Sequence, residues 1–277
     1  MASATQNNSA AMAIIDSGLG GISVVRALRA AAPTLGLIYA ADTAGFPYGG
    51  QNTEQVTARG VGMVEALLAQ QGVKQVVVAC NTLSTLSLAA MRAALPHITI
   101  VGTVPAIKVA AERSQSKRFT LLATPNTAHS PYSKSLIDRF AHDCVVDAVG
   151  APKLAMLCEK HLLGEAISDE AWRAEIAACF HDDARGKTDA VILGCTHYPL
   201  VTPILRKLAP WDVMWIDSSD AIARQALKDF NGAGINGAYV TNGDDCARYG
   251  ELFAREGLGL CHTLTLGGAL MSEAARG

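Results

Sequence analysis

The 277-residue sequence predicts an α/β fold made of two doubly wound domains, each built on a mainly parallel sheet. Short apolar segments rich in β-branched residues alternate with amphipathic segments of helical length, which is the pattern of strands joined by crossover helices. The pattern starts again near the middle of the chain, and each half has a cysteine directly after a buried strand. The two domains are therefore expected to face each other across a pseudo-two-fold axis, with an active site between them.

Composition and charge narrow the possible function classes. Half of the residues are hydrophobic and 17% are charged, so the chain can bury a large core. The 25 acidic and 23 basic residues nearly cancel, which argues against a general nucleic-acid-binding surface. No apolar run is long enough to span a membrane, and no Lys or Arg precedes Arg26, so no signal peptide is expected. Met1–Ala10 is small and polar and is expected to be frayed.

The seven cysteines are widely spaced and odd in number, and no Cys-x-x-Cys pair occurs. This is not the pattern of a disulfide framework, so the thiols are expected to be reduced and the protein cytoplasmic. Structural zinc is not expected either, because the paired ligand spacings of zinc sites are missing.

The first half of the chain alternates strands and helices. Its predicted strands are 11–15, 37–41, 75–79 and 99–101. Its predicted helices follow the first three strands and end near Ala32, at Gln71 and at Ala94. The second helix is the best defined, because Asn52 with Gln55 matches a capping box and Gly72 is a stop signal.

Two loops of this half can bring the backbone close to a ligand. The first runs from Asp16 to Gly21, but it lacks the third glycine of a dinucleotide fingerprint and the Gly-Lys-Ser/Thr of a phosphate loop. A tight turn capped by Asp16 explains it equally well. In the second loop, 42–50, Tyr48 and the backbone amides after it can grip a carboxylate, although an ordinary turn with one packed tyrosine explains this loop equally well.

The strand–helix pattern restarts in the second half. The predicted strands here are 119–123, 145–148, 190–193, 213–216 and 238–241. The predicted helices are 130–140, 153–163 and 169–183, the last with Ser168 as N-cap, and one after each of the two final strands. Helical crossovers between buried strands favour parallel sheets throughout.

The restart divides the chain into two predicted domains. Residues 1–103 together with 213–277 form the first, which carries Cys80, and residues 104–212 form the second, which carries Cys195. Each of these cysteines leaves a buried strand and enters a threonine-containing turn at the start of a helix. Ligands bind at such strand ends in open α/β sheets, and a helix N-terminus tends to lower the pKa of a thiol. Both cysteines are therefore candidate reactive groups.

The residues next to the two cysteines are polar or suited to a helix start. Asn81 and Thr82 are predicted to cap the helix after the first cysteine. Pro199 suits the first turn of the helix after the second. The other five cysteines are expected only to pack in the core: Cys144, Cys158, Cys179, Cys246 and Cys261.

Three chemistries can use Cys80 and Cys195. Cys195 with His197 as base would make a nucleophile, as in an amidase, but leaves Cys80 without a task. A metal site of both thiols and His197 has no motif of fixed spacing behind it. In the third chemistry, the two thiols act as base and acid on opposite faces of one carbon and invert its stereocentre. This third chemistry explains why there are two cysteines and why no cofactor motif is visible.

Five sequence blocks follow one another along most of the chain: Asp16-Ser17-Gly18; Asp42-Thr43 with Phe46-Pro47-Tyr48-Gly49; Ala79-Cys80-Asn81-Thr82; Gly102-Thr103 with Pro105-Ala106; and Leu193-Gly194-Cys195-Thr196-His197-Tyr198-Pro199-Leu200. Together they resemble the signature blocks of bacterial glutamate racemases, and the last block is the most specific. Related aspartate racemases usually have a glutamate residue where this chain has His197, so His197 favours glutamate over aspartate as the substrate. The departures are mild and lie at Ile15, Gly50-Gln51 and Leu83.

The resemblance implies cofactor-independent interconversion of L- and D-glutamate by the two-thiol chemistry. It implies that Cys80 deprotonates the D-isomer and Cys195 the L-isomer, and that Asp16 and His197 assist proton transfer at the two thiols. The substrate contacts it implies are Ser17, Tyr48, Gly49, Asn81, Thr82 and Thr196. Weaker candidates are Thr124, Thr127 and Glu159, and an exposed helix charge would explain the last of these as well.

The resemblance also implies a cellular role and partners. It implies D-glutamate production for peptidoglycan in a bacterial cytoplasm, a homodimer, and glutamate as small-molecule partner, with no metal, cofactor, nucleic acid or membrane. Two alternatives stay open. One is a racemase of the same superfamily that acts on aspartate or another amino acid. The other is a non-catalytic binding protein on the same fold, although the intact cysteine blocks argue against it.

Overall fold

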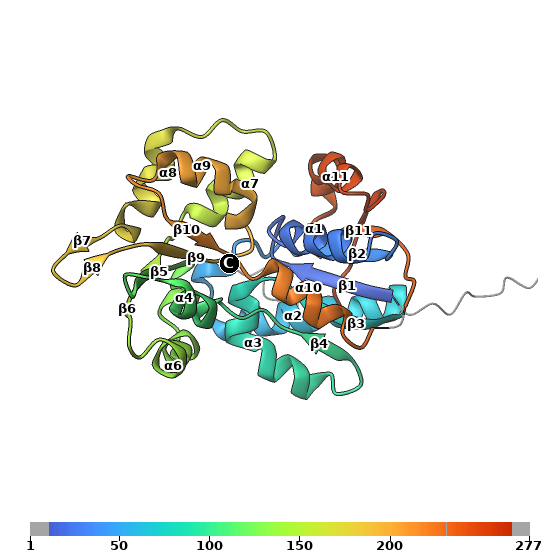
Figure 1. The fold of residues 1–277 in the computed structure, drawn as a ribbon. Helices are drawn as coiled ribbons and strands as arrows, with labels where there is room; N and C mark the ends of the chain where they lie inside the picture. The colour runs from blue at the N-terminus through green and yellow to red at the C-terminus, as the bar shows by residue number, and fades with distance from the viewer. Residues whose placement is uncertain (1–10, 231, 268–277) are drawn as a thin grey trace, which may run out of the picture.

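The computed structural model describes residues 11–230 and 232–267, and two parallel sheets organise them (Figure 1). The larger sheet has the strand order β12-β11-β2-β1-β3-β4, and the smaller sheet has the order β10-β9-β5-β6. The predicted α/β fold with two parallel-sheet domains is therefore confirmed. We call the two parts the larger-sheet half and the smaller-sheet half. The predicted frayed stretch, Met1–Ala10, lies outside the described residues.

The larger-sheet half has helices on both faces of its sheet. Its strands are β1 (Ala11–Asp16), β2 (Leu37–Ala41), β3 (Val73–Val78), β4 (Thr99–Val101), β11 (Gly237–Val240) and β12 (Cys261–Thr263). Its helices are α1 (Ile22–Ala31), α2 (Thr53–Gln71), α3 (Asn81–Ala94), α10 (Ser219–Leu227) and α11 (Cys246–Arg255). Successive residues of β1 point to opposite faces, so Ala13 and Ile15 pack with α2 and α3, while Met12 and Ile14 pack with α1 and α10. Burial on both faces explains the uninterrupted apolar sequence of this strand.

The smaller-sheet half is layered in the same way. Its strands are β5 (Arg118–Ala123), β6 (Val145–Gly150), β9 (Ala190–Gly194) and β10 (Met214–Ile216). Its helices are α4 (Ile107–Arg113), α5 (Pro125–Ala128), α6 (Pro131–Phe140), α7 (Leu154–Leu162), α8 (Asp169–Ile176) and α9 (Thr202–Leu208). Helices α4 and α6 cover one face of the sheet, and α7, α8 and α9 cover the other. A small antiparallel hairpin, β7 (Asp182–Asp183) with β8 (Gly186–Lys187), projects from this half (Figure 1).

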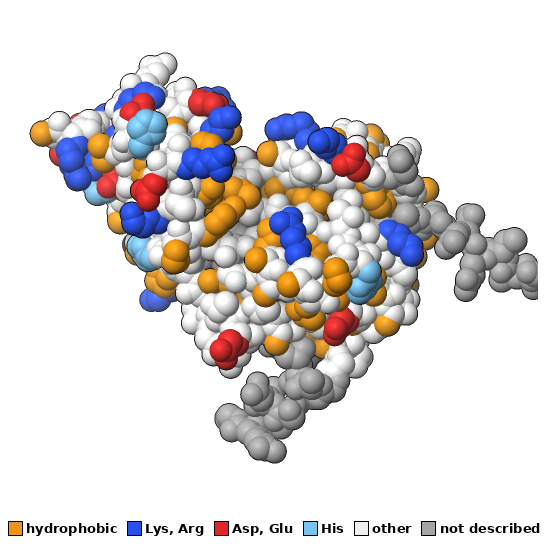
Figure 2. Space-filling model, turned by 90° about the horizontal axis from the view of Figure 1, so that it is seen from below, with side chains coloured by type: hydrophobic (Ala, Val, Ile, Leu, Met, Phe, Trp, Pro, Cys, Tyr) orange, Lys and Arg blue, Asp and Glu red, His pale blue; other side chains and the backbone are white. Residues whose placement is uncertain are grey.

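The outer surface follows this division into two lobes. On the face shown in Figure 2, the surface is hollowed where the lobes meet, and Lys and Arg side chains are scattered over both lobes. Among the helices that the structure describes, none combines the length and the apolar character needed to cross a bilayer.

The two sheets share one strand order. Numbered along the chain within each half, β2-β1-β3-β4 and β6-β5-β9-β10 both have the order 2-1-3-4. Strands β3 and β9 therefore hold equivalent places. Cys80 follows β3 after one residue, and Cys195 follows β9 directly. In sheets of this order the ligand crevice lies at the carboxyl ends of the strands beside the first strand, so the topology places both cysteines at such a crevice.

Three local predictions about helix ends are confirmed. At the start of α2, Asn52 Oδ1 accepts a hydrogen bond of 2.9 Å from the backbone N–H of Gln55, and Gly72 ends this helix with a φ of 59°. At the start of α8, Ser168 Oγ accepts a hydrogen bond of 3.3 Å from the backbone N–H of Ala171. Short-range capping chemistry therefore fixes these boundaries.

The predicted helix 169–183 is wrong in its second part. Helix α8 ends at Ile176, a short 3-10 turn follows, and the chain then turns back through the β7–β8 hairpin. The reason is tertiary, because Asp183 accepts hydrogen bonds from the buried guanidinium of Arg118 and from the backbone N–H of Arg185. Helical periodicity carries no sign of such contacts, so the pattern continues where the helix does not.

The tail differs from the predicted division as well. Strand β10 pairs with β9, so residues 214–216 belong to the smaller sheet, although the sequence-based division places 213–277 in the first domain. The chain returns to the larger sheet only with β11 and β12. Strand β12 is absent from the prediction because Cys261-His262-Thr263 is a largely exposed edge strand without the apolar run that marks the buried strands.

Candidate active site

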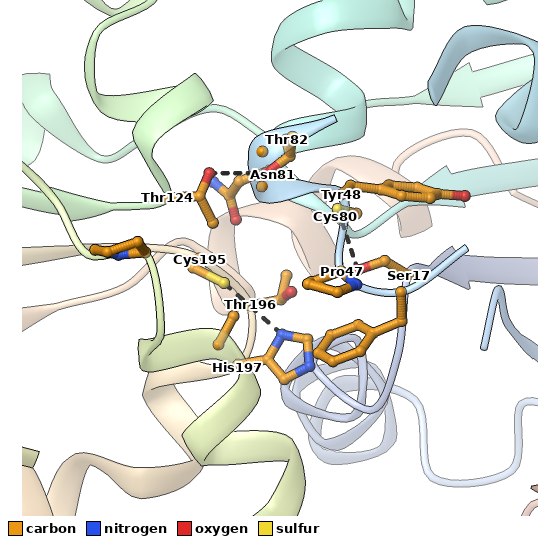
Figure 3. A pocket seen from close by; sticks show the side chains of 15 residues that line it. Ser17, Pro47, Tyr48, Cys80, Asn81, Thr82, Thr124, Cys195, Thr196 and His197 are labelled. Carbon is orange, nitrogen blue, oxygen red and sulfur yellow. Dashed lines mark hydrogen bonds between the residues drawn. The ribbon is translucent and has the colours of Figure 1, made fainter. Parts of the chain in front are cut away.

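A pocket lies between the two halves, at the carboxyl ends of their sheets (Figure 3). The larger-sheet half contributes Ser17, Phe46, Pro47, Tyr48, Gly49, Gly50, Cys80, Asn81 and Thr82 to its wall. The smaller-sheet half contributes Thr124, Pro152, Ala155, Cys195, Thr196 and His197. The two halves thus each bring one cysteine side chain to the same pocket.

On the larger-sheet side, Cys80 faces a hydroxyl. Its Sγ donates a long hydrogen bond of 3.8 Å to Oγ of Ser17. The two residues meet because they follow neighbouring strands, β3 and β1, in which Val78 is paired with Ile15. The cysteine is 5% exposed, so a substrate that reaches it must displace the little solvent present.

The charge state of Cys80 follows from its burial. Burial raises the pKa of this thiol, and the carboxylate of Asp16 raises it further. The backbone N–H of Leu83, in the first turn of α3, lowers the pKa by less. The lowering expected at a helix N-terminus is therefore outweighed, and the Cys80 thiol is protonated at neutral pH.

Asp16 joins the two halves. It ends β1, is fully buried, and its Oδ1 accepts a hydrogen bond of 3.0 Å from the backbone N–H of Gly18, which is the predicted turn cap. Its Oδ2 accepts a hydrogen bond of 2.9 Å from the hydroxyl of Thr196 in the other half. Burial raises the pKa of Asp16, while the positive charge of His197 opposes this rise.

On the smaller-sheet side, Cys195 faces an imidazole. Its Sγ lies 3.7 Å from Nδ1 of His197, and Nε2 of the same ring lies 2.7 Å from Oε2 of Glu159. Burial lowers the pKa of His197, but the hydrogen bonds with Cys195 and Glu159 together outweigh burial and hold it well above its usual value. The ring therefore carries a proton at neutral pH and can stabilise negative charge on Cys195.

Glu159 is buried, so its interpretation as an exposed helix charge is wrong. It projects from α7 and is 4% exposed. Its Oε2 accepts a hydrogen bond of 2.9 Å from the backbone N–H of Leu19, and its Oε1 accepts one of 2.6 Å from the hydroxyl of Tyr249. Both donors belong to the larger-sheet half. Tyr249 cannot be identified from the sequence, because a tyrosine on an amphipathic helix gives no sign of where its hydroxyl points.

Three threonine hydroxyls also connect the halves. Oγ1 of Thr82 lies 2.9 Å from Oγ1 of Thr124 and 3.4 Å from Oγ1 of Thr127. The predicted capping of α3 by Asn81 or Thr82 is wrong, because Cys80 takes the N-cap position and its side chain makes no cap hydrogen bond. Thr82 turns to Thr124 instead, which leaves the first N–H groups of α3 available for a carboxylate.

Tyr48 lines the pocket, but its hydroxyl is engaged elsewhere. The hydroxyl donates a hydrogen bond to the carboxylate of Asp42, which also pairs with the guanidinium of Arg59. The tyrosine is therefore a fixed wall with its phenol already bonded. The next residue, Gly49, touches the other half, since a Cβ there would lie 3.0 Å from Cβ of Thr124. Glycine at this position lets the loop close on the smaller-sheet half.

The residues predicted from the sequence fall into two groups. Those that line the pocket are Cys80, Cys195, His197, Ser17, Tyr48, Gly49, Asn81, Thr82, Thr196 and Thr124. Those that lie behind the wall and bond to lining residues are Asp16, Thr127 and Glu159. Within residues 11–230 and 232–267, no three His, Cys, Asp or Glu side chains are grouped as metal ligands.

Comparison with known proteins agrees with this geometry. The family model Asp/Glu/Hydantoin racemase matches residues 22–226. The glutamate racemases of Agrobacterium fabrum and Rhizobium meliloti are 47% and 46% identical to this chain over 213 residues, which are 77% of this chain and 78% and 77% of theirs. The crystal structure of Escherichia coli glutamate racemase in complex with L-glutamate and the activator UDP-MurNAc-Ala matches with a TM-score of 0.85 and 33% identity, over 94% of this chain and 100% of that one. The chain therefore belongs to the Asp/Glu/hydantoin racemase family and, within it, to the glutamate racemases.

Proposed function

We propose that this protein interconverts L- and D-glutamate without a cofactor, with Cys80 and Cys195 as the two proton-transfer groups. The observation that carries the proposal is that two thiols from equivalent strand ends line one pocket, each with a different polar partner. Glutamate is favoured as substrate because the curated relatives are glutamate racemases and the Escherichia coli relative binds L-glutamate.

The reaction needs one thiolate and one thiol at the start. Beside the protonated ring of His197, Cys195 is the thiolate and removes the α-proton of L-glutamate. Cys80, protonated because burial raises its pKa, returns a proton to the opposite face and yields D-glutamate. One proton is taken and one is given, and the enzyme is left with the thiolate on Cys80 and the thiol on Cys195. That form accepts D-glutamate and runs the reaction backward.

The α-proton of an amino acid is a very weak acid, so the carbanion that forms must be stabilised. The free N–H groups at the start of α3 can hold the substrate α-carboxylate, since a helix N-terminus favours negative charge. Ser17, Asn81 and Thr196 add hydroxyl and amide groups for the rest of the substrate. Asp16 assists proton transfer at Cys80, and His197 does so at Cys195.

The cellular role and assembly are part of the same proposal. D-glutamate made in this way supplies peptidoglycan in a bacterial cytoplasm, where the seven free thiols suit a reducing environment. The homodimer is a prediction from the family, and light scattering of the purified protein tests it.

Circular dichroism of the purified protein incubated with D-glutamate alone tests the activity. The optical signal should decay to zero without any added cofactor, and the α-hydrogen should exchange with deuterium from D₂O. D-aspartate in place of D-glutamate separates the proposal from an aspartate racemase. A protein that binds glutamate but leaves its optical signal unchanged would be a binding protein, and the proposal would be wrong.

A further inference from the structure

Tyr249 reaches from one half of the molecule to a series of linked polar side chains in the other. We call this series, Glu159, His197 and Cys195, the polar chain. It lies on α11, in the larger-sheet half, and is 4% exposed. Its ring packs against Phe253, with the ring centroids 6.0 Å apart. Its hydroxyl donates a hydrogen bond of 2.6 Å to Oε1 of Glu159, on α7 of the smaller-sheet half. The contact therefore exists only while the two halves are together.

The two oxygens of the Glu159 carboxylate share the backbone N–H of Leu19, and each has one further side-chain partner. Oε2 receives the 2.9 Å hydrogen bond from the backbone N–H of Leu19 and lies 2.7 Å from Nε2 of His197. Oε1 takes the phenol of Tyr249 and a longer hydrogen bond of 3.2 Å from Leu19. The phenol thus fixes the rotation of the carboxylate and leaves Oε2 directed at the imidazole.

The polar chain continues from Glu159 to a reactive thiol. A carboxylate beside an imidazole stabilises the protonated ring, and that imidazole, 3.7 Å from Cys195, stabilises a thiolate. The Cys80 side has no counterpart of this chain in the described contacts, where the thiol faces Ser17. A change at the phenol should therefore reach one of the two proton transfers and not the other.

We propose that Tyr249 is a positioning residue for the proton transfer at Cys195, acting through Glu159 and His197. The proposal rests on the proposed racemase function. Because Tyr249 and Leu19 belong to the opposite half from Glu159, the same contact aligns the imidazole only when the halves are closed around the pocket. Tyr249 is not among the residues that line the pocket, so its proposed role is one of alignment.

The variant Tyr249→Phe tests this, because it removes the hydroxyl and keeps the ring that packs on Phe253. We expect kcat/KM to fall about tenfold, the effect of one hydrogen bond to a charged group. The fall must be the same for both enantiomers, because the equilibrium constant of racemisation is one. The matched control is Tyr239→Phe, on β11 of the same half, which should keep wild-type rates.

Primary isotope effects with α-deuterated substrates separate alignment from a general structural effect. If the transfer at Cys195 is slowed, its step limits the rate more strongly. The isotope effect on kcat/KM should then rise for L-glutamate, whose C–H bond Cys195 breaks, and fall for D-glutamate, whose C–H bond Cys80 breaks. Wild-type kcat/KM in Tyr249→Phe, or a loss of rate with both isotope effects unchanged, overturns the proposal.

A measurement without turnover keeps this result apart from the fate of the racemase proposal. The ¹⁵N signals of the His197 ring, assigned by comparison with His197→Asn, should move toward those of a neutral imidazole in Tyr249→Phe at pH 7.5. Unchanged ring signals overturn the positioning role whatever the protein catalyses. Absence of racemisation by the wild-type protein, in contrast, overturns the proposed function, and the ring signals still decide whether Tyr249 sets the state of His197.

Discussion

Cys80 and Cys195 follow equivalent strands in two sheets of the same order, but their surroundings differ in kind. Cys80 faces the hydroxyl of Ser17, and burial together with the Asp16 carboxylate raises the pKa of its thiol. Cys195 faces the ring of His197, which is protonated and is held by Glu159. One thiol thus stands near negative charge and the other near positive charge.

This difference teaches how a repeated fold can serve an asymmetric resting state. Repetition of the strand order gives each half a cysteine at the same place, which suits two transfers on opposite faces of one carbon. In the proposed mechanism, the charged neighbours decide which cysteine holds the proton before substrate arrives. Both sets of neighbours cross between the halves, through Asp16 with Thr196 on one side and Glu159 with Leu19 on the other, so the asymmetry depends on closure.

The largest effects are expected when either thiol is removed. Cys80→Ala and Cys195→Ala should each lower kcat by about 10³-fold or more for both enantiomers, because each direction of the reaction uses both thiols. Circular dichroism with each enantiomer measures this. Cys144→Ala, a partly exposed cysteine away from the pocket, is the matched control and should keep wild-type activity. Substantial activity in either active-site variant would show that the two thiols do not share the reaction.

The next effects separate the two sides. Asp16→Asn and His197→Asn should each lower kcat/KM by about 10²-fold, since each removes a group that tunes one thiol. For a given α-deuterated enantiomer, the primary isotope effect on kcat/KM should change in opposite directions in the two variants. Asp16→Asn slows the Cys80 step and should raise the effect for D-glutamate, while His197→Asn slows the Cys195 step and should raise it for L-glutamate. Equal changes in both variants would mean that the two sides are not independent.

The sequence is enough to predict the fold class, most strands and the two cysteines, because these depend on short-range patterns. The apolar run before Cys80 and the one before Cys195 need only local periodicity to be identified as buried strands. Capping residues such as Asn52 are equally local. The carboxyl ends of neighbouring parallel strands meet by topology alone, so Ser17 and Cys80 can be placed together without coordinates.

The remaining features depend on contacts between segments that are distant in the chain. Glu159 looks like an exposed helix charge until the halves close over it, and Tyr249 gives no signal before α11 is docked. The turn after Ile176 is set by the buried Arg118 and its partner Asp183, which no periodicity shows. Residue patterns can therefore name the candidate reactive groups, but they miss the groups that hold them across the interface.

A smaller effect on kcat/KM is expected when the carboxylate of Glu159 is kept from packing against Gly18. A Cβ at Gly18 would lie 2.7 Å from Oε1 of Glu159, so Gly18→Ala should push the carboxylate away from His197. We expect kcat/KM to fall about tenfold with little change in thermal stability. The control is Gly250→Ala on α11, where the nearest atom to a new Cβ is 3.7 Å away. Full activity in Gly18→Ala would show that Glu159 need not lie within hydrogen-bond distance of His197. Glu159 would then not be one of the charged groups that distinguish the Cys195 side from the Cys80 side.

The smallest effect is on stability against pH, and it reports the charge of His197 directly. Because the folded-state pKa of this ring is raised, the folded protein keeps a proton that the unfolded chain releases above about pH 6.5. The stabilisation is complete below that pH and is lost as the pH rises through the folded value. The proposed resting form carries a thiolate on Cys195, so the wild type also gives up a thiol proton on folding, and the comparison is made in a Cys195→Ala background. Between pH 6.5 and 8, the free energy of unfolding of Cys195→Ala should fall relative to that of Cys195→Ala/His197→Asn, by at most about 1.4 kcal/mol per pH unit.

Urea unfolding at pH 6, 7 and 8 measures this difference. The range stops at pH 8 because unfolded thiols begin to ionise near pH 8.5, where the raised pKa of Cys80 would add a second proton of the same sign. Asp16 also has a raised pKa, so the difference between Cys195→Ala and Cys195→Ala/His197→Asn is the informative quantity and not the slope of either protein alone. A difference that stays constant from pH 6 to 8 would mean that the ring is neutral when folded. Cys195 would then lack the positive partner that distinguishes it from Cys80.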